Sequence, residues 1–243
     1  MNKKILFTTS CFLFSIIANC QFAWSDSRPS TASAVHNFNM YSFNNALSGR
    51  FTSFNDIANT KGKRYLFDNW VQGRVINSQG ALVVNDSFYY NVDKMQNDLL
   101  VKNGSQIIVV DKNEVGTFTI SDGKDQYTFE RVDIIKPNQF FIVVAKNEKY
   151  AVYKLINTKF IKADYHTNGL SESGNTYDEY KDEFIYYAVS FSDKKFQQFD
   201  LKKKSIKTAF ESINNNSDSF FEQHKSDDIN DDYFKQLVDY LNR

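Results

Sequence analysis

The chain has 243 residues, and its 29 basic and 29 acidic side chains give a formal net charge of zero. A balanced charge argues against nucleic acid or a strongly anionic surface as a partner. Both cysteines, Cys11 and Cys20, lie near the start, so the rest of the chain can form no disulfide and has no thiol chemistry. Its stability therefore depends on a hydrophobic core, which a chain of this length can build.

Residues 1–20 have the pattern of a secretory signal peptide. Lys3 and Lys4 form a basic start, an apolar run covers residues 5–18, and small or polar residues follow. Hydroxyl residues interrupt the apolar run, which is shorter than the roughly 20 residues that a transmembrane helix needs. We therefore expect an exported protein with no transmembrane span in its mature chain.

Two processing routes are open at Cys20. Ordinary cleavage after this residue leaves a mature protein that starts at Gln21, with Ala18 as a second small residue before the cut. Lipidation of Cys20 is the alternative, although Asn19 stands where a bacterial lipobox has Gly, Ala or Ser. We expect ordinary cleavage and a periplasmic or extracellular protein, with an outer-membrane lipoprotein as the alternative.

Residues 21–61 form a polar leader rich in Ser, Asn, Thr and Ala. Its first half, with Pro29 and a Ser-Thr-Ala-Ser run, is typical of disordered chain. Aromatic residues are too frequent between Phe43 and Ala58 for a linker, so we expect a short helix or turn that packs against the following domain.

Residues 62–201 have the pattern of an antiparallel β domain. Short segments rich in β-branched and aromatic residues alternate with Asn-Gly, Asp-Gly and Asn-Glu turns. Strands are expected at residues 81–84, 87–92, 99–102, 105–110, 115–121, 124–132, 139–145 and 149–156. A polar loop between Tyr165 and Asp182 is expected to precede a last strand pair at residues 184–191 and 196–201.

Two-residue turns at Asp122-Gly123 and Asn103-Gly104 predict two hairpin registers. At the first turn Phe118 faces Tyr127, and at the second Lys102 faces Ser105. One face of the first hairpin then carries Phe118, Ile120, Tyr127 and Phe129, and the other carries Thr117, Thr119, Gln126, Thr128 and Glu130. Such one-sided burial is typical of an antiparallel sheet.

The hairpin around Asn147-Glu148 has apolar residues on both faces. Its expected register pairs Val144 with Ala151. One face then carries Phe140, Ile142, Val144, Tyr153 and Leu155, and the other carries Phe141, Val143, Ala145, Tyr150 and Val152. Because both faces need cover, we expect the sheet to curl into a barrel-like or two-layer arrangement, or helices to cross it.

Residues 202–243 change to a helical period. Amphipathic helices are expected at residues 203–213, 217–224 and 231–241. Asp231 or Asp232 is the expected N-cap of the last helix, and its apolar stripe of Phe234, Leu237, Val238 and Leu241 is expected to pack on the β domain. The predicted fold class is therefore mainly β with a small helical tail.

Two segments carry a resemblance to known proteins. Residues 62–75 read Gly-x-x-Tyr-Leu-Phe-x-x-Trp-x-x-Gly-x-Val, and the tail has an acidic cluster followed by Leu-x-x-Tyr-Leu-Asn. With the antiparallel strands between them, these segments resemble a group of uncharacterised secreted proteins of Bacteroidetes-type bacteria. The resemblance covers residues 62–242 and implies an envelope location and an all-β core, without catalytic residues to carry over.

The residue types that support catalysis or metal binding are present but lack the necessary spacing. The three histidines, His36, His166 and His224, are too far apart for a metal site. Asp164, His166, Ser171 and Ser173 have the composition of a hydrolase triad, but the chain has no Gly-x-Ser-x-Gly elbow. We therefore interpret these residues as ordinary polar side chains.

Two further patterns could indicate a calcium-binding loop and a sugar-binding platform, but each has a simpler structural explanation. Asp228, Asn230, Asp232 and Asp239 have EF-hand-like spacing. Tyr233, however, stands where the loop needs Gly, and N-capping explains the aspartates. Trp70 and the many Phe and Tyr residues could stack on sugars, but these residues also suit β-strands, so core packing is favoured.

The sequence predicts no catalytic, cofactor-binding or metal-binding residue and no cofactor. The leading hypothesis is a non-catalytic exported envelope protein that binds another protein or an envelope component. The alternative is a secreted hydrolase of unrecognised type that acts on glycans or peptides. An outer-membrane β-barrel is disfavoured because most expected strands are shorter than the about 9 to 11 residues that such strands need.

Overall fold

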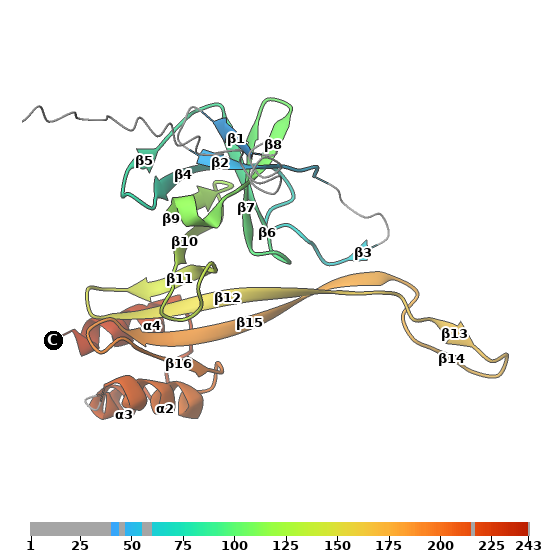
Figure 1. Ribbon diagram of the computed structural model, residues 1–243. Helices are drawn as coiled ribbons and strands as arrows, with labels where there is room; N and C mark the ends of the chain where they lie inside the picture. Colours follow the sequence, from blue (N-terminus) through green and yellow to red (C-terminus); the bar gives the residue numbers. More distant parts are fainter. Residues whose placement is uncertain (1–39, 44–46, 55–59, 215–216, 243) are drawn as a thin grey trace, which may run out of the picture.

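Two large β-sheets and three short C-terminal helices make up most of the described chain (Figure 1). The computed structural model describes residues 40–43, 47–54, 60–214 and 217–242. The predicted signal peptide, the processing of Cys20 and the first half of the polar leader lie outside the described residues. None of the described helices is long and apolar enough to cross a membrane.

The elements follow the order expected of a mainly β chain. The strands are β1 (Met40–Phe43), β2 (Leu47–Phe51), β3 (Thr60–Lys61), β4 (Gln72–Asn77), β5 (Leu82–Val83), β6 (Phe88–Asp93), β7 (Asp98–Asn103), β8 (Gln106–Val110), β9 (Val115–Ser121), β10 (Gln126–Arg131), β11 (Phe140–Lys146), β12 (Tyr150–Ile161), β13 (His166–Thr167), β14 (Glu172–Ser173), β15 (Asp178–Ser190) and β16 (Lys195–Phe199). The helices are η1 (Lys112–Glu114), α2 (Lys203–Ile213), α3 (Asp218–Gln223) and α4 (Asp231–Leu241).

The two large sheets enclose the first hydrophobic core. One sheet has the order β1-β2-β8-β7-β6, and the other has the order β16-β15-β12-β11-β10-β9-β4-β5, with β3 parallel to β15. Side chains from both sheets, among them Tyr90, Ile108, Phe118 and Phe140, form one buried cluster. Both strand orders end in edge strands, so the described strands form no closed barrel.

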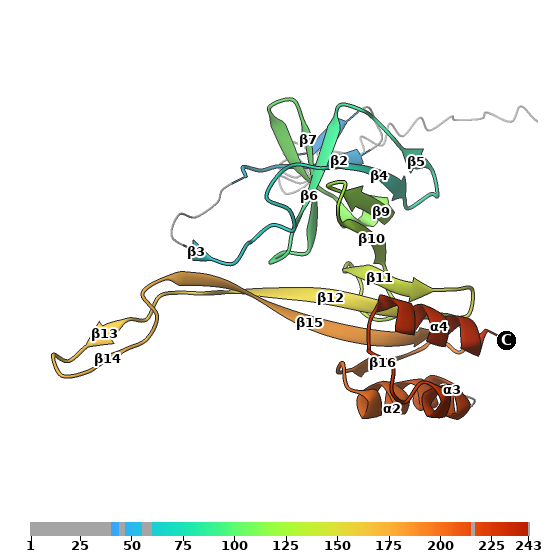
Figure 2. The same ribbon diagram turned by 180° about the vertical axis from the view of Figure 1, so that it is seen from behind.

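The helices cover one face of the far end of the nine-stranded sheet (Figure 2). Val152, Ala188 and Phe199 of the sheet pack against Phe210 of α2 and Phe234 of α4. The predicted stripe of α4 is buried as expected, since Phe234, Leu237, Val238 and Leu241 are at most 8% exposed. A smaller cluster lies on the opposite face, around Phe141, Tyr153 and Val189.

The predicted helix or turn between Phe43 and Ala58 is wrong for the residues described there. Leu47–Phe51 is strand β2, which pairs with β8 in the five-stranded sheet. Leu47 is fully buried, so a segment with a polar composition contributes to the core. Successive side chains of a strand point to opposite faces, so only alternate residues of β2 need to be apolar. The polar residues between them made the segment resemble a polar leader.

The predicted hairpin registers are wrong, although the face assignment of the first is kept. Ile120 pairs with Tyr127 and not with Asp125, because Asp122 Oδ1 accepts hydrogen bonds from Lys124 N and Asp125 N in a four-residue turn. Lys102 likewise faces Ile107, a shift of two residues. A shift of two residues keeps each side chain on its face.

The third hairpin slips by one residue and therefore exchanges faces. Val143 pairs with Tyr153, and the register shifts again before Ala145. Tyr153 and Leu155 consequently share a cluster with Phe141, whereas the sequence placed them with Phe140 and Ile142. Both faces are nevertheless buried, as the apolar pattern predicted.

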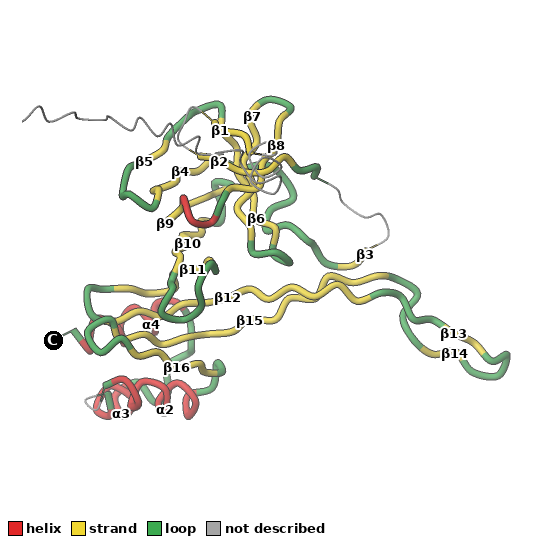
Figure 3. The backbone as a smooth tube through the Cα atoms, viewed as in Figure 1, coloured by secondary structure: helices red, strands yellow, loops and turns green. Residues whose placement is uncertain are grey.

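The predicted polar loop between Tyr165 and Asp182 contains two short strands and the start of a long one. β15 begins at Asp178 and pairs with β12 as far as Ile161, and β13 and β14 form a small hairpin at the end (Figure 3). Polar side chains hide these strands from an analysis of hydrophobicity because this ribbon extends away from the body. One further correction concerns α4, whose N-cap is Asn230 and not Asp231 or Asp232.

Candidate functional site

A polar cleft of about 540 Å³ lies beside the five-stranded sheet. β2 contributes one wall, the end of β8 and η1 another, and the β6–β7 turn and the loop before β11 complete it. Its lining residues are Gly49, Arg50, Gln96, Asp98, Val109, Val110, Asp111, Lys112, Asn113 and Asn138.

Local sequence explains the shape of this cleft. Gly49 allows the close approach of β2 and β8, because a Cβ atom there would lie 2.1 Å from the carbonyl oxygen of Val109. Asp111 caps η1, where its Oδ1 accepts hydrogen bonds from the backbone N and the Nδ2 of Asn113 at 2.9 and 3.1 Å. A side-chain cap of this kind satisfies the first free N–H of a helical turn.

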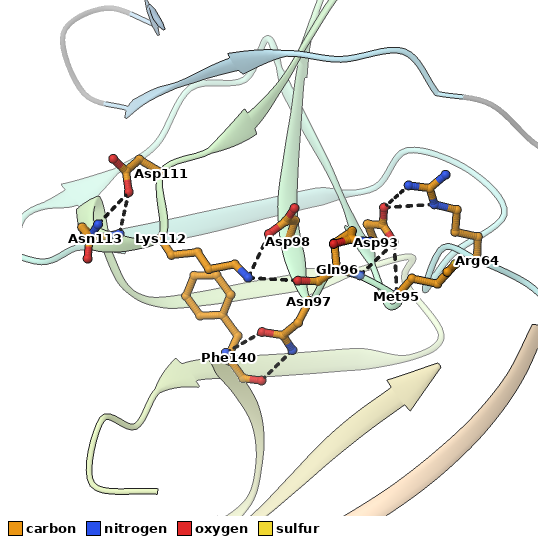
Figure 4. A network of polar contacts seen from close by, with 10 residues as sticks. All are labelled: Arg64, Asp93, Met95, Gln96, Asn97, Asp98, Asp111, Lys112, Asn113 and Phe140. Carbon is orange, nitrogen blue, oxygen red and sulfur yellow. Dashed lines mark hydrogen bonds and ion pairs between the residues drawn. The ribbon is translucent and has the colours of Figure 1, made fainter. Parts of the chain in front are cut away.

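Lys112 and Asp98 form an ion pair inside the cleft (Figure 4). The Nζ of Lys112 lies 2.9 Å from Asp98 Oδ1, and it donates a second hydrogen bond of 2.9 Å to the carbonyl oxygen of Gln96. The two side chains are 22% and 16% exposed. This pair therefore connects η1 to β7 and gives the cleft a fixed wall.

The β6–β7 turn is held from two sides. Asn97 bonds both backbone groups of Phe140, with its Nδ2 donating to O at 2.9 Å and its Oδ1 accepting from N at 2.7 Å. Asp93 accepts hydrogen bonds from Arg64 through one carboxylate oxygen and from the Met95 backbone N through the other. The bond to Asp93 raises the pKa of Arg64, so the guanidinium stays charged.

Three lining side chains have no intramolecular partner in the described part of the chain. The guanidinium of Arg50 forms no ion pair there, and the amides of Gln96 and Asn138 form no side-chain hydrogen bond. Arg50 and Asn138 are also exposed. Donors and acceptors thus face a preformed cleft that no aromatic ring lines, which suits a polar ligand better than a stacked sugar ring.

The structure brings together two of the residues considered for a hydrolase. Ser173 Oγ lies 2.7 Å from His166 Nε2, and His166 Nδ1 lies 3.1 Å from the backbone carbonyl oxygen of Asp164. The Asp164 carboxylate instead accepts from Asn175 N, and Ser171 bonds Asn168. His166 and Ser173 are exposed cross-strand partners of β13 and β14, an arrangement that a simple hairpin pair explains.

The remaining candidates have structural roles. His224 stacks on Phe220 and bonds Asp227, and His36 lies outside the described residues. Asn230 caps α4 by accepting from Tyr233 N at 2.9 Å. No group of three potential metal ligands occurs in the described residues. Trp70 packs near Phe54 and does not line the cleft.

Sequence reasoning missed the cleft because its residues come from four separate segments. Asp98 and Lys112 are neither close in sequence nor part of a recognisable motif, and only the β7–β8 hairpin brings them together. The one local signal was the Asp-Lys-Asn-Glu stretch that starts at Asp111, since Asp is a favoured N-cap residue.

No protein-family model matches the chain, and no curated protein or solved structure is significantly similar to it. The resemblance of residues 62–242 to secreted proteins of Bacteroidetes-type bacteria therefore stays a prediction.

Proposed function

We propose that this protein is a non-catalytic exported envelope protein, and that its cleft binds an acidic peptide segment of another protein. The observation that carries the proposal is the exposed Arg50, which has no ion-pair partner among the described residues and lines the cleft together with the amides of Gln96 and Asn138. Export to the periplasm or the extracellular space rests on the signal pattern of residues 1–20 and on the resemblance to secreted proteins. Lipidation of Cys20 is the alternative route to the envelope.

The chemistry of the cleft supports this choice of ligand. A guanidinium binds a carboxylate through two parallel hydrogen bonds, whereas Lys112 is already paired with Asp98. The amides of Gln96 and Asn138 can each donate and accept, as a peptide backbone requires. The volume of about 540 Å³ is within the range of small-ligand sites and holds a few residues.

Fluorescence anisotropy with a fluorescein-labelled Gly-Asp-Glu-Gly peptide tests the proposal. We expect saturable binding to the wild-type protein and an affinity at least about tenfold weaker for Arg50→Gln, because a charge-assisted pair is lost. Arg74→Gln is the matched control, since Arg74 is also an exposed strand arginine but lies outside the cleft. Equal affinities of the two variants, or no binding to the wild type, would contradict the proposal.

A secreted hydrolase is the second candidate, and the short contact between His166 and Ser173 is the observation that favours it. Labelling with a fluorophosphonate probe separates the two functions. A hydrolase that uses this pair would be labelled at Ser173 and would lose the label in His166→Ala. We expect no label, because both residues are exposed and neither lines the polar cleft.

A further inference from the structure

A groove of about 400 Å³ lies between the last strand, β16, and the helix that follows it, α2. In Figures 1 and 2, β16 lies between β15 and α2. The walls of the groove include Gln197 and Gln198 of β16 and Lys204, Ser205 and Thr208 of α2. Successive side chains of a strand point to opposite faces of a sheet, so a groove that both glutamines line runs along the outer edge of β16.

The hydrogen bonding of β15 shows which backbone groups of β16 are free. Phe191 N, just beyond β15, donates to the carbonyl oxygen of Lys149, just before β12. Bonding alternates along an antiparallel ladder, so the odd-numbered residues of β15 bond β12 and the even-numbered ones bond β16. The even-numbered residues of β15 face odd-numbered residues of β16. Phe196 and Gln198 therefore direct their N–H and C=O groups away from the sheet.

This outer edge of β16 is open. Lys195–Gln198 is exposed along its whole length, and Phe196 is 43% exposed. Within the described part of the chain no strand pairs with this edge. The edge ends at Asp200, whose backbone N donates to Ser205 Oγ at 3.0 Å as the chain turns into α2. Phe196 and Gln198 thus offer their free backbone groups to an added strand.

Positive charge surrounds the groove. Residues 195–210 contain five lysines and one acidic residue, Asp200. Lys202 and Lys204 line the groove, and Lys195 stands at the other end of β16. A second copy of this chain is a poor partner, because antiparallel pairing of two β16 strands would bring the lysines at the start of one strand near those that follow the other. An acidic partner complements this charge.

We propose that the groove is a second binding site, at which an extended segment of another protein, with acidic side chains at its ends, adds as a strand to the edge of β16. The backbone of the segment bonds the free groups of Phe196 and Gln198, and its carboxylates meet the lysines at the two ends of the groove. Addition of a strand to an exposed sheet edge is a recurrent mode of peptide recognition. The site is independent of the cleft proposed above, which lies beside the other sheet.

Fluorescence anisotropy with a fluorescein-labelled Glu-Thr-Val-Thr-Val-Glu peptide tests for strand addition to the full chain. We expect saturable binding. Only every second N–H of an added strand points to its neighbour. N-methylation of the third or of the fourth peptide residue should therefore have unequal effects, with affinity at least about tenfold weaker for one peptide and little changed for the other. Equal effects of the two modifications, or no binding of the unmodified peptide, would overturn the proposal.

Amide hydrogen exchange, followed by NMR, locates the added strand on the protein. The bound peptide should slow the exchange of the Phe196 and Gln198 amides by at least about tenfold, because each gains a hydrogen bond. The Gln197 amide is the internal control, since it already bonds β15 and should change least. Equal slowing of all three amides, or of none, would show that the peptide does not add as a strand.

Charge variants separate the groove from the cleft. Lys204→Glu should weaken binding of the peptide about tenfold. Lys162→Glu is the matched control, because Lys162 is exposed and lines neither the groove nor the cleft. Arg50→Gln should also leave this affinity unchanged, since Arg50 belongs to the cleft. Equal losses at Lys204 and Lys162, or a loss at Arg50 alone, would place the peptide elsewhere and refute the proposal.

Discussion

Asn97 shows how one side-chain amide can fix the position of a turn. Its backbone φ of 54° lies in the left-handed region, which Asn adopts more readily than most other residues. Its side chain bonds the N–H and the C=O of Phe140, and both residues are buried. The amide therefore takes the place of a missing strand partner and ties the β6–β7 turn, and with it one wall of the cleft, to β11.

Replacing this amide should be costly. Asn97→Ala leaves two buried backbone groups of Phe140 without a partner and places Ala at positive φ, so we expect a loss of about 2 to 5 kcal/mol. Asn138→Ala is the matched control, because Asn138 has a φ of 56° but is exposed. The Asn138→Ala variant should lose only the stability that placing Ala at positive φ costs, about 1 to 2 kcal/mol. Urea unfolding measures both values, and similar losses would show that the Phe140 bonds contribute little.

At the scale of elements, the hydrophobic period predicts which strands and helices form better than it predicts how neighbouring strands pair. The strands expected between residues 81 and 156 all form, and the bounds of α2 and α4 are as expected. The registers differ because Asp122 and Asn147 each accept hydrogen bonds from the backbone N of the residues two and three positions later. A rule based on dipeptide φ preferences does not include this side-chain acceptor.

The α4 helix illustrates an element whose role follows from its pattern. Leu237 is fully buried between α4 and the sheet, so Leu237→Ala should cost about 2 to 5 kcal/mol through lost contacts and a cavity. Gln236→Ala, on the exposed face of the same helix, should change stability by less than about 0.5 kcal/mol. Thermal unfolding compares the two. Equal melting temperatures would mean that α4 frays without affecting the sheet.

At the scale of the whole molecule, polar contacts join parts that the sequence cannot place together. The Nζ of Lys94, at the β6–β7 turn, lies 2.6 Å from Oδ2 of Asp182 in β15, and the hydroxyl of Thr158 in β12 donates to Oδ1 of Asp182. Lys94 is only 8% exposed. This contact has no local sequence signal, and the cleft has only the capping signal at Asp111, because each depends on sheet topology. Hydrophobic patterning predicted the cores, and the surfaces between them required the structure.

Two buried tyrosines make the stability of the folded protein depend on pH in the alkaline range. Tyr90 belongs to the core between the sheets and Tyr233 to the core beneath the helices, and neither hydroxyl has a hydrogen-bond partner in the described residues. Burial raises the pKa of each to about 12, whereas tyrosine in an unfolded chain ionises near 10. Each neutral phenol therefore contributes stability that is complete below pH 10 and is lost as the pH rises through 12.

Phenylalanine substitutions separate this effect from packing. At pH 7, Tyr90→Phe and Tyr233→Phe should each be at least as stable as the wild type, because an unpaired buried hydroxyl is removed. Between pH 7 and pH 12 each variant should lose less stability than the wild type, by on the order of 2 kcal/mol. Urea unfolding at both pH values measures the difference. If the two substitutions move one shared transition, the cores unfold together, and if the alkaline loss is the same with and without either hydroxyl, these tyrosines do not limit stability at high pH.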